Sequence, residues 1–155
     1  EVHRKFHAAG SDSEKFEIIL NNLAIIGGMN EQEGNRLLGF VLDKAPTLSE
    51  GGLILQRLAE GMNAVPEGWM EIRRKAQGAL HGFLAGRIQR IENKLGGPAC
   101  SRESFQLRKR IQTQLAKGQM QDPKIKNLLL RRDFDDWMAG KSFITDLAEA
   151  AGRGS

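Results

Sequence analysis

Hydrophobic residues recur along most of the chain at the three- and four-residue spacing of an α-helix. The pattern is clear between residues 12 and 26, where apolar and polar positions alternate with the helical period. Its apolar positions are Phe16, Ile19, Leu20, Leu23 and Ile26. Ser11 and Glu14 form a capping-box pattern at its start, and Gly27 and Gly28 favour a stop. We expect a helix over about 12–26, with residues 1–10 as a frayed lead-in.

Three short signals with the character of helix starts recur every 17 residues. They are "NEQEG" at 30–34, "TLSEG" at 47–51 and "AVPEG" at 64–68. In the first two, Asn30 and Thr47 are candidate N-caps, with Glu33 and Glu50 three residues later. Pro66 suits the first turn of a third helix, where its missing N–H costs nothing. We interpret the signals as helix punctuation at one period, and a true helical repeat is the alternative.

Further helices are expected to the end of the chain. Their ranges are about 66–95, 101–117, 122–139 and 142–151. Ser101 and Asp122-Pro123 mark two of the starts, and Gly140 a stop. The positions expected to face the core are Trp69, Ile72, Ala76, Leu80, Phe83, Ile91, Leu95, Phe105, Leu107, Ile111, Leu115, Ile125, Leu128, Leu129, Trp137, Met138, Phe143, Ile144 and Leu147. Short loops between such helices predict an all-α fold, a compact bundle of about six to seven helices with one long central helix over about 66–95.

The composition agrees with this fold and bears on the number of domains and the cellular compartment. The 155 residues suit a single domain over 1–155, and tyrosine, a frequent strand residue, is absent. No apolar run approaches the roughly 20 residues that span a bilayer. The single Cys100 cannot form an internal disulfide and suits a reducing compartment, so we expect a cytoplasmic protein. Because the chain opens on Glu1 and closes on "GRGS", we expect an excerpt of a longer chain, with any targeting signals outside it.

Three glycines interrupt the longest predicted helix at intervals of four residues. Gly78, Gly82 and Gly86 together cost about 3 kcal/mol relative to alanine in a helix interior. Residues four apart lie on one side of a helix, so the three form a strip without side chains that another backbone can approach closely. Close internal packing is the expected reason for them. A kink or hinge, or a groove for a partner helix, are the alternatives.

The net charge of +4 conceals a strong segregation along the chain. Residues 1–65 carry a net −3, residues 66–132 a net +10, and residues 133–155 a net −3. Such asymmetry bears on partners rather than on fold. The candidate polyanion-binding residues in the middle block are Arg73, Arg74, Arg87, Arg90, Lys94, Arg102, Arg108, Lys109, Arg110, Lys117, Lys124 and Lys126.

If these cations share one face, a polyanion can lie across them and release its counterions. The low aromatic content around the block argues against base stacking and favours contact with a duplex backbone. Two alternatives stay open. The charges can solvate the bundle or pair with the acidic flanks, or they can meet an acidic protein.

Sites for metal or cofactor chemistry find little support. His3 and His7 have helical i, i+4 spacing but no evident third ligand. No flanking pattern clearly lowers the pKa of Cys100, which we interpret as a plain thiol. The "AGKS" at 139–142 resembles the end of a phosphate-binding loop, but Asp135 stands where its leading glycine is required. We therefore expect no metal and no cofactor.

The segment "RRDFDDW" offers three carboxylates, Asp133, Asp135 and Asp136. Arg132 can reach the last two at i+3 and i+4, so ion pairs are favoured over catalysis. We expect no enzyme and no small-molecule substrate. The leading hypothesis is a helical module that binds nucleic acid or another polyanion through residues 66–132. The alternative is a protein-interaction domain, adaptor or effector-like, of a larger bacterial protein.

Overall fold

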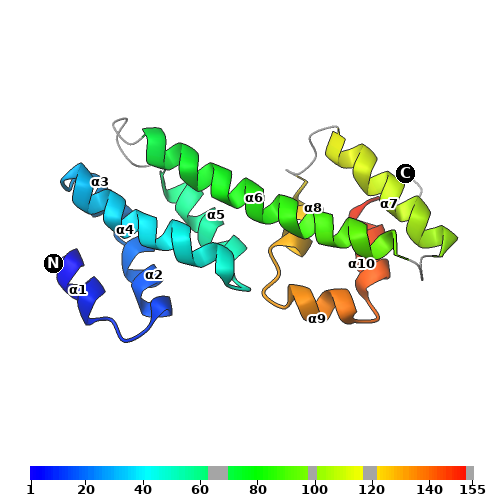
Figure 1. Ribbon diagram of the computed structural model, residues 1–155, viewed down its shortest axis with the longest axis horizontal. Coiled ribbons are helices and arrows are strands. Elements are labelled where there is room, and N and C mark those ends of the chain that lie inside the picture. The colour runs from blue at the N-terminus through cyan, green and yellow to red at the C-terminus, as the bar shows by residue number, and fades with distance from the viewer. Residues whose placement is uncertain (63–69, 98–100, 117–121, 153–155) are drawn as a thin grey trace. The chain divides into compact units, whose positions relative to one another are not determined.

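The computed structural model describes residues 1–62, 70–97, 101–116 and 122–152 (Figure 1). Within these ranges the regular structure is entirely helical, which confirms the predicted all-α class. The chain packs as two compact units, Glu1–Phe83 and Leu84–Ser155, and the boundary falls inside the long helix α6 (Met70–Leu95). The predicted long central helix is therefore confirmed over its described part, while the single domain stays a prediction.

The first unit surrounds an apolar core with short and medium helices. Its elements are α1 (Val2–Ala8), α2 (Asp12–Leu20), α3 (Leu23–Gly27), α4 (Glu31–Lys44), the 3₁₀ helix η1 (Ala45–Thr47), α5 (Gly51–Gly61) and the first part of α6. The fully buried core includes Ile19, Ile26, Leu37, Leu38, Val41, Leu55, Leu58 and Met62. The apolar stripe expected over 12–26 is buried throughout, because each of its positions faces this core.

The beginning of the chain differs from the expected frayed lead-in. Residues 2–8 form α1, and Val2 is 3% exposed in the core. The predicted helix over 12–26 is broken into α2 and α3. At the break, Asn22 Nδ2 donates to the carbonyl of Ile18 at 2.6 Å and satisfies an acceptor that the end of α2 leaves open.

Two of the predicted caps in the first unit are confirmed by hydrogen bonds. Ser11 Oγ accepts from the backbone N–H of Glu14 at 3.2 Å, and α2 begins directly after Ser11. Asn30 Oδ1 accepts from the N–H of Gln32 at 2.9 Å at the start of α4. Short polar side chains at these positions fix both helix starts as the sequence indicates.

The predicted cap at Thr47 is wrong. Thr47 ends η1, and its hydroxyl donates back to the carbonyl of Lys44 at 2.6 Å. The next helix, α5, begins at Gly51 and has no side-chain cap at Glu50. The similarity of "TLSEG" to "NEQEG" therefore does not extend to the cap geometry. The third start, at Pro66, lies outside the described residues.

The second unit contains the later part of α6 and four shorter helices. These are α7 (Arg102–Ala116), α8 (Pro123–Leu129), α9 (Phe134–Ala139) and α10 (Phe143–Ala150). Its core includes Leu84, Ile91, Leu95, Leu107, Ile111, Leu129, Phe134, Trp137, Phe143 and Leu147. Ser101 and Asp122 cap α7 and α8 as predicted. The predicted helix over 122–139 is broken between Leu129 and Phe134, so α8 and α9 are separate elements.

The glycine strip does not lie at a helix contact. Gly78, Gly82 and Gly86 are exposed, and a Cβ built on any of them meets no heavy atom within 4 Å. The expected close internal packing is therefore wrong for these three positions. α6 continues through them as one α-helix. None of the described helices combines the length and hydrophobicity needed to cross a membrane.

Because Gly82 has open space around it, Gly82→Ala should stabilise the protein. Alanine loses less backbone entropy than glycine in a helix, so we expect a gain of about 0.5–1 kcal/mol. Thermal unfolding followed by circular dichroism measures it, and Gly78→Ala should add a similar increment. A loss of stability at Gly82 would show that another part of the molecule packs there.

Candidate polyanion interface

The predicted cationic site is divided between the two units. Arg73 and Arg74 belong to the first unit, and Lys117 lies outside the described residues. The other members belong to the second unit: Arg87, Arg90, Lys94, Arg102, Arg108, Lys109, Arg110, Lys124 and Lys126. Over residues 84–155 the sequence has fourteen Lys and Arg against eight Asp and Glu, a net +6, whereas residues 1–83 carry a net −2. Most of the predicted cations therefore belong to one unit, the second.

Arg87 is a structural residue and not part of a cationic surface. It is 7% exposed, and its Nη1 donates to the carbonyls of Leu129 and Arg131, both at 2.8 Å. The guanidinium also lies 4.5 Å from the centroid of the Phe134 ring. Burial lowers the pKa of Arg87, and the nearby Asp135 opposes that shift. Its place in the predicted polyanion site is thus wrong, because its donors bind backbone carbonyls at the end of α8 and just after it.

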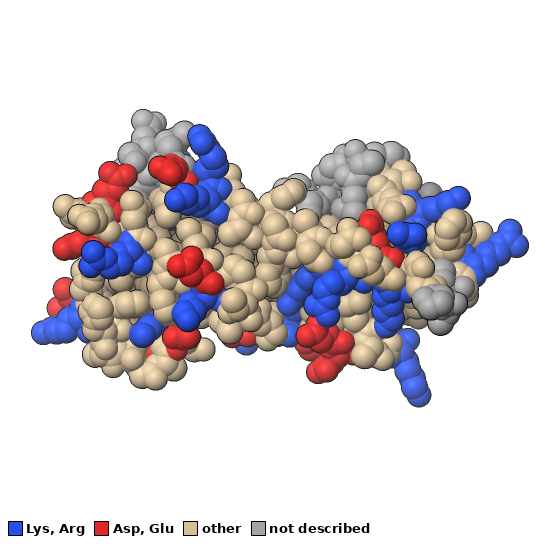
Figure 2. Space-filling model, viewed as in Figure 1, with Lys and Arg blue, Asp and Glu red and all other residues tan. Residues whose placement is uncertain are grey.

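Acidic side chains on and before α9 neutralise two further cations. Arg90 forms an ion pair with Asp135. Arg131 donates to both carboxylate oxygens of Asp133, at 2.9 and 3.0 Å. This hydrogen bonding raises the pKa of Arg131 and lowers the pKa of Asp133. Figure 2 shows the acidic side chains gathered at α9 beside basic ones. The ion pairs predicted from Arg132 to Asp135 and Asp136 are not found among the described residues. The pairs Arg90–Asp135 and Arg131–Asp133 form instead.

Lys94, at the end of α6, is exposed, and its Nζ lies 4.5 Å from the centroid of the Phe143 ring. It covers part of the aromatic core with its stem and keeps its charge at the surface. On α8, Lys124 is exposed and Lys126 is half-buried. None of the three forms an ion pair with a described carboxylate. They remain candidate contacts for an anion.

One side of α7 presents an exposed surface of polar and cationic residues with one aromatic residue among them, which we call the α7 outer face. It consists of Arg102, Phe105, Gln106, Lys109, Gln112 and Thr113, all of them exposed. The opposite side of the helix is fixed by Leu107 and Ile111, which are 3% and 4% exposed in the core. Because these two residues determine which side of α7 points inward, the spacing of the outer residues places them together on the outside.

Phe105 was expected in the core, and the structure contradicts this. It is 47% exposed, in the middle of the α7 outer face. Phe105 and Leu107 are two positions apart, about 200° around a helix, so they cannot both face inward. Lys109 lies one turn after Phe105, with its Nζ 4.8 Å from the ring centroid. The ring is therefore flanked by charge and reaches solvent.

The cations of the α7 outer face, Arg102 and Lys109, have no acidic partner among the described residues. Neither Arg102 nor Lys109 lies within ion-pair distance of a carboxylate in the described part of the chain. Glu103 is the one acidic residue of α7, and it lies about 100° around the helix from Arg102. Arg108 and Arg110 are half-buried beside this face. The guanidinium of Arg108 sits against Gly96, where a Cβ would lie 2.9 Å from Nη1.

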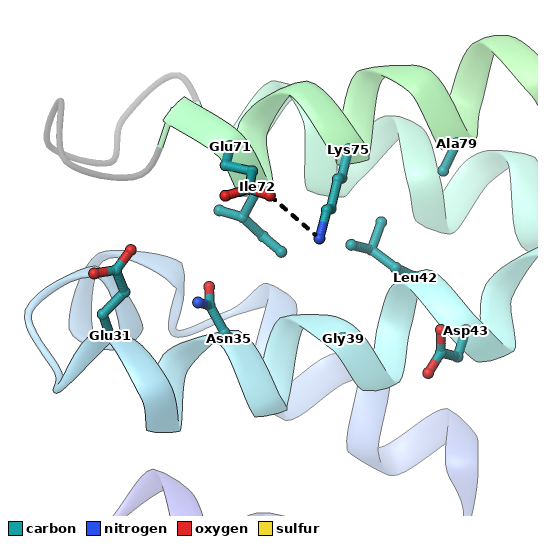
Figure 3. Close-up of a pocket in the computed structure, with 9 residues that line it drawn as sticks. All are labelled: Glu31, Asn35, Gly39, Leu42, Asp43, Glu71, Ile72, Lys75 and Ala79. Atoms are coloured by element: carbon teal, nitrogen blue, oxygen red, sulfur yellow. Dashed lines mark ion pairs between the residues drawn. The ribbon is translucent and has the colours of Figure 1, made fainter.

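A pocket of about 500 Å³ in the first unit was not found from the sequence (Figure 3). It lies between α4 and α6, and Lys75 and Glu71 form an ion pair of 3.7 Å beside it. Its lining residues are Glu31, Asn35, Gly39, Leu42, Asp43, Glu71, Ile72, Lys75 and Ala79. Gly39 leaves part of this space open, since a Cβ there would meet no atom within 4 Å. A lone glycine in a helical pattern gives no signal of a pocket.

The described residues contain no group of three His, Cys, Asp or Glu side chains placed to hold a metal ion. His3 and His7 stack with ring centroids 6.1 Å apart. His3 Nε2 lies 3.6 Å from a carboxylate oxygen of Glu33, so α1 is tied to α4 by this contact. The helical spacing of the two histidines therefore places them together at the packed start of the chain.

Comparison with known proteins adds no assignment. No protein-family model matches the chain, and no curated protein or solved structure is significantly similar to it. The function has to follow from the side chains themselves.

Proposed function

We propose that this chain is a non-enzymatic binding module that holds a polyanion, with nucleic acid as the leading candidate, on the α7 outer face. The observation that carries the proposal is the exposure of Arg102 and Lys109, neither of which has a carboxylate partner in the described part of the chain. The net +6 of residues 84–155 attracts an anion from a distance. Contact with these two cations then releases counterions from the polyanion.

The spacing and chemistry of the face suit a nucleic-acid backbone. Arg102 and Lys109 are seven residues apart, which corresponds to about 10 Å along a helix. Successive nucleotides of one strand advance by about 3.4 Å in B-DNA, so the two cations match phosphates about three nucleotides apart. Gln106 and Gln112 supply amide groups that can contact phosphate and sugar, while the Thr113 hydroxyl donates to the carbonyl of Lys109. The cytoplasmic setting expected from the sequence also suits this ligand.

Reversing the two cations tests the proposal. Arg102→Glu combined with Lys109→Glu should weaken binding to mixed-sequence DNA at least about tenfold at low salt, because two phosphate contacts are replaced by repulsion. The slope of log K against log salt should fall by roughly 1.8 in magnitude if both cations contact duplex phosphates. Fluorescence anisotropy over a salt series measures both quantities.

The matched control is Arg132→Glu combined with Lys141→Glu. Both residues are exposed, have no ion pair with a described carboxylate and lie outside α7. The control changes the net charge by the same amount as the test variant. Because its residues lie outside the α7 outer face, it should reduce affinity less than the test variant and leave the salt slope nearly unchanged. Equal losses in both variants would show that overall charge decides binding. Absence of binding by the unmodified chain at low salt would reject the proposal.

A protein-interaction domain is the second candidate, and the exposed glycines favour it. The backbone of α6 at Gly78 and Gly82 is open, so a partner helix can approach it closely. Gly82→Leu should then remove partner capture while the chain remains folded. Capture that survives nuclease treatment and is lost in this variant would favour the protein partner over nucleic acid.

A further inference from the structure

Phe105 is unusual among the large hydrophobic residues of the described chain. Apart from Phe105, Ile25 in the first unit is the large hydrophobic side chain that is exposed there. Phe105 lies on a helix side whose other members are cationic or polar. A single exposed aromatic residue needs no special explanation by itself. An explanation is needed because Phe105 lies between two cations, Arg102 and Lys109, that pair with no carboxylate of the described ranges.

We propose that Phe105 stacks on a base of a single-stranded nucleic acid while Arg102 and Lys109 contact the phosphates on either side. This inference rests on the proposed polyanion binding and adds the class of ligand. Phe105 follows Arg102 by three residues and precedes Lys109 by four, so the ring lies between the two cations along the helix. Aromatic rings next to a cationic backbone track are the usual elements of single-strand binding.

The position of Lys109 agrees with this arrangement. Its ammonium lies 4.8 Å from the centroid of the Phe105 ring, so a positive charge is held beside the stacking surface. The phosphate that adjoins a stacked base must pass close to that surface. The flexible stem of Lys109 allows the ammonium to move from the ring to the phosphate when a base arrives. Lys109 therefore contacts the Phe105 ring when no nucleic acid is bound and the phosphate when a base is stacked.

A duplex is a poorer ligand for this face than a single strand. In a duplex the base faces are covered by their neighbours, and the exposed ring would meet sugar and phosphate. The sequence favoured a duplex because few aromatic residues accompany the basic block, and the exposure of Phe105 changes that expectation. A stable protein–protein interface buries roughly 800 Å² per partner around an apolar centre, and the α7 outer face offers one apolar side chain.

The experiment compares two ligands of equal backbone charge. One is fluorescein-labelled (dT)10, and the other is a labelled ten-unit abasic deoxyribose-phosphate chain. The unmodified chain should bind (dT)10 at least roughly fivefold more tightly than the abasic chain, because stacking is added to the phosphate contacts. Phe105→Leu should reduce this preference to below about twofold and leave affinity for the abasic chain unchanged. Leucine keeps an apolar side chain and a good helix former at an exposed position, so the variant should fold.

The outcomes separate the two proposals. Equal binding of (dT)10 and the abasic chain, or a preference that persists in Phe105→Leu, overturns the stacking and leaves polyanion binding in place. A ten-base-pair duplex bound more tightly than (dT)10 also overturns it. Absence of binding to all three ligands at low salt rejects the polyanion function itself. A base-dependent preference that is lost with the ring supports the inference.

Discussion

Arg87→Met should lower the free energy of unfolding of the second unit by about 3 kcal/mol, because hydrogen bonds from a charged donor are worth roughly 1.5–3 kcal/mol each. Arg87 donates to the carbonyl of Leu129 at the end of α8 and to that of Arg131 between α8 and α9. Methionine keeps most of the aliphatic stem of the arginine. The measured loss therefore reports the two hydrogen bonds and the carbonyls that lose their donor.

The control is Arg90→Met, one turn further along α6. Arg90 is exposed, and its ion pair with Asp135 is open to solvent, so its removal should cost below about 1 kcal/mol. Urea unfolding of both variants gives the comparison. Amide hydrogen exchange should also accelerate across residues 123–139 in Arg87→Met, since the anchor of this segment is lost. Similar stabilities for the two variants would show that the buried guanidinium does not hold α8 and α9 in place.

The same variant separates the role of Arg87 in the fold from any role in binding. Arg87 is buried and uses its donors on backbone carbonyls. At a temperature where Arg87→Met remains folded, its affinity for (dT)10 should equal that of the unmodified chain. A clear loss of affinity in the folded variant would restore Arg87 to the cationic site that the sequence predicted.

The sequence predicted the helices well where the period of apolar residues determines which side faces the core. The stripe from Phe16 to Ile26 is buried as expected, because a hydrophobic side must face inward wherever the helix ends. The breaks at Asn22 and between α8 and α9 were missed. At both breaks, hydrogen bonds from side chains replace those of a continuing helix, by Asn22 in one and by the distant Arg87 in the other. The period of apolar residues does not indicate where a side chain will replace the backbone hydrogen bonds of a helix.

The candidate site was predictable as a block of charge but not as a surface. Arg87 and Lys109 look alike in the sequence, yet one is buried against backbone carbonyls and the other is exposed. The difference arises from residues 42 and 44 positions away, which supply the acceptors for Arg87. Phe105 was misplaced for a related reason. Leu107 and Ile111 are sufficient to bury one side of α7, so the ring two positions before Leu107 remains outside.

The glycines are another case in which the sequence does not show the surroundings of a residue. Gly78, Gly82 and Gly86 on α6 have open space around them, whereas Gly51 is tightly enclosed. A Cβ on Gly51 would overlap the carbonyl oxygen of Ala45, lie 2.8 Å from its carbonyl carbon and lie 3.2 Å from the Phe83 ring. Two of these atoms belong to the backbone, and Ala45 is fully buried at the start of η1. The carbonyl also accepts from Leu48, so it is held in place. The first turn of α5 thus requires a residue without a side chain.

Gly51→Ala should therefore destabilise the first unit by at least about 3 kcal/mol, the upper range for overpacking a closed site. The same chemical change at Gly82 should stabilise, so the two variants are expected to shift the midpoint of thermal unfolding in opposite directions. Circular dichroism at 222 nm measures both. A loss below about 1 kcal/mol at Gly51 would mean that η1 and α5 can separate at little cost. In that case the nearby Ala45 carbonyl would not be what requires a glycine at position 51.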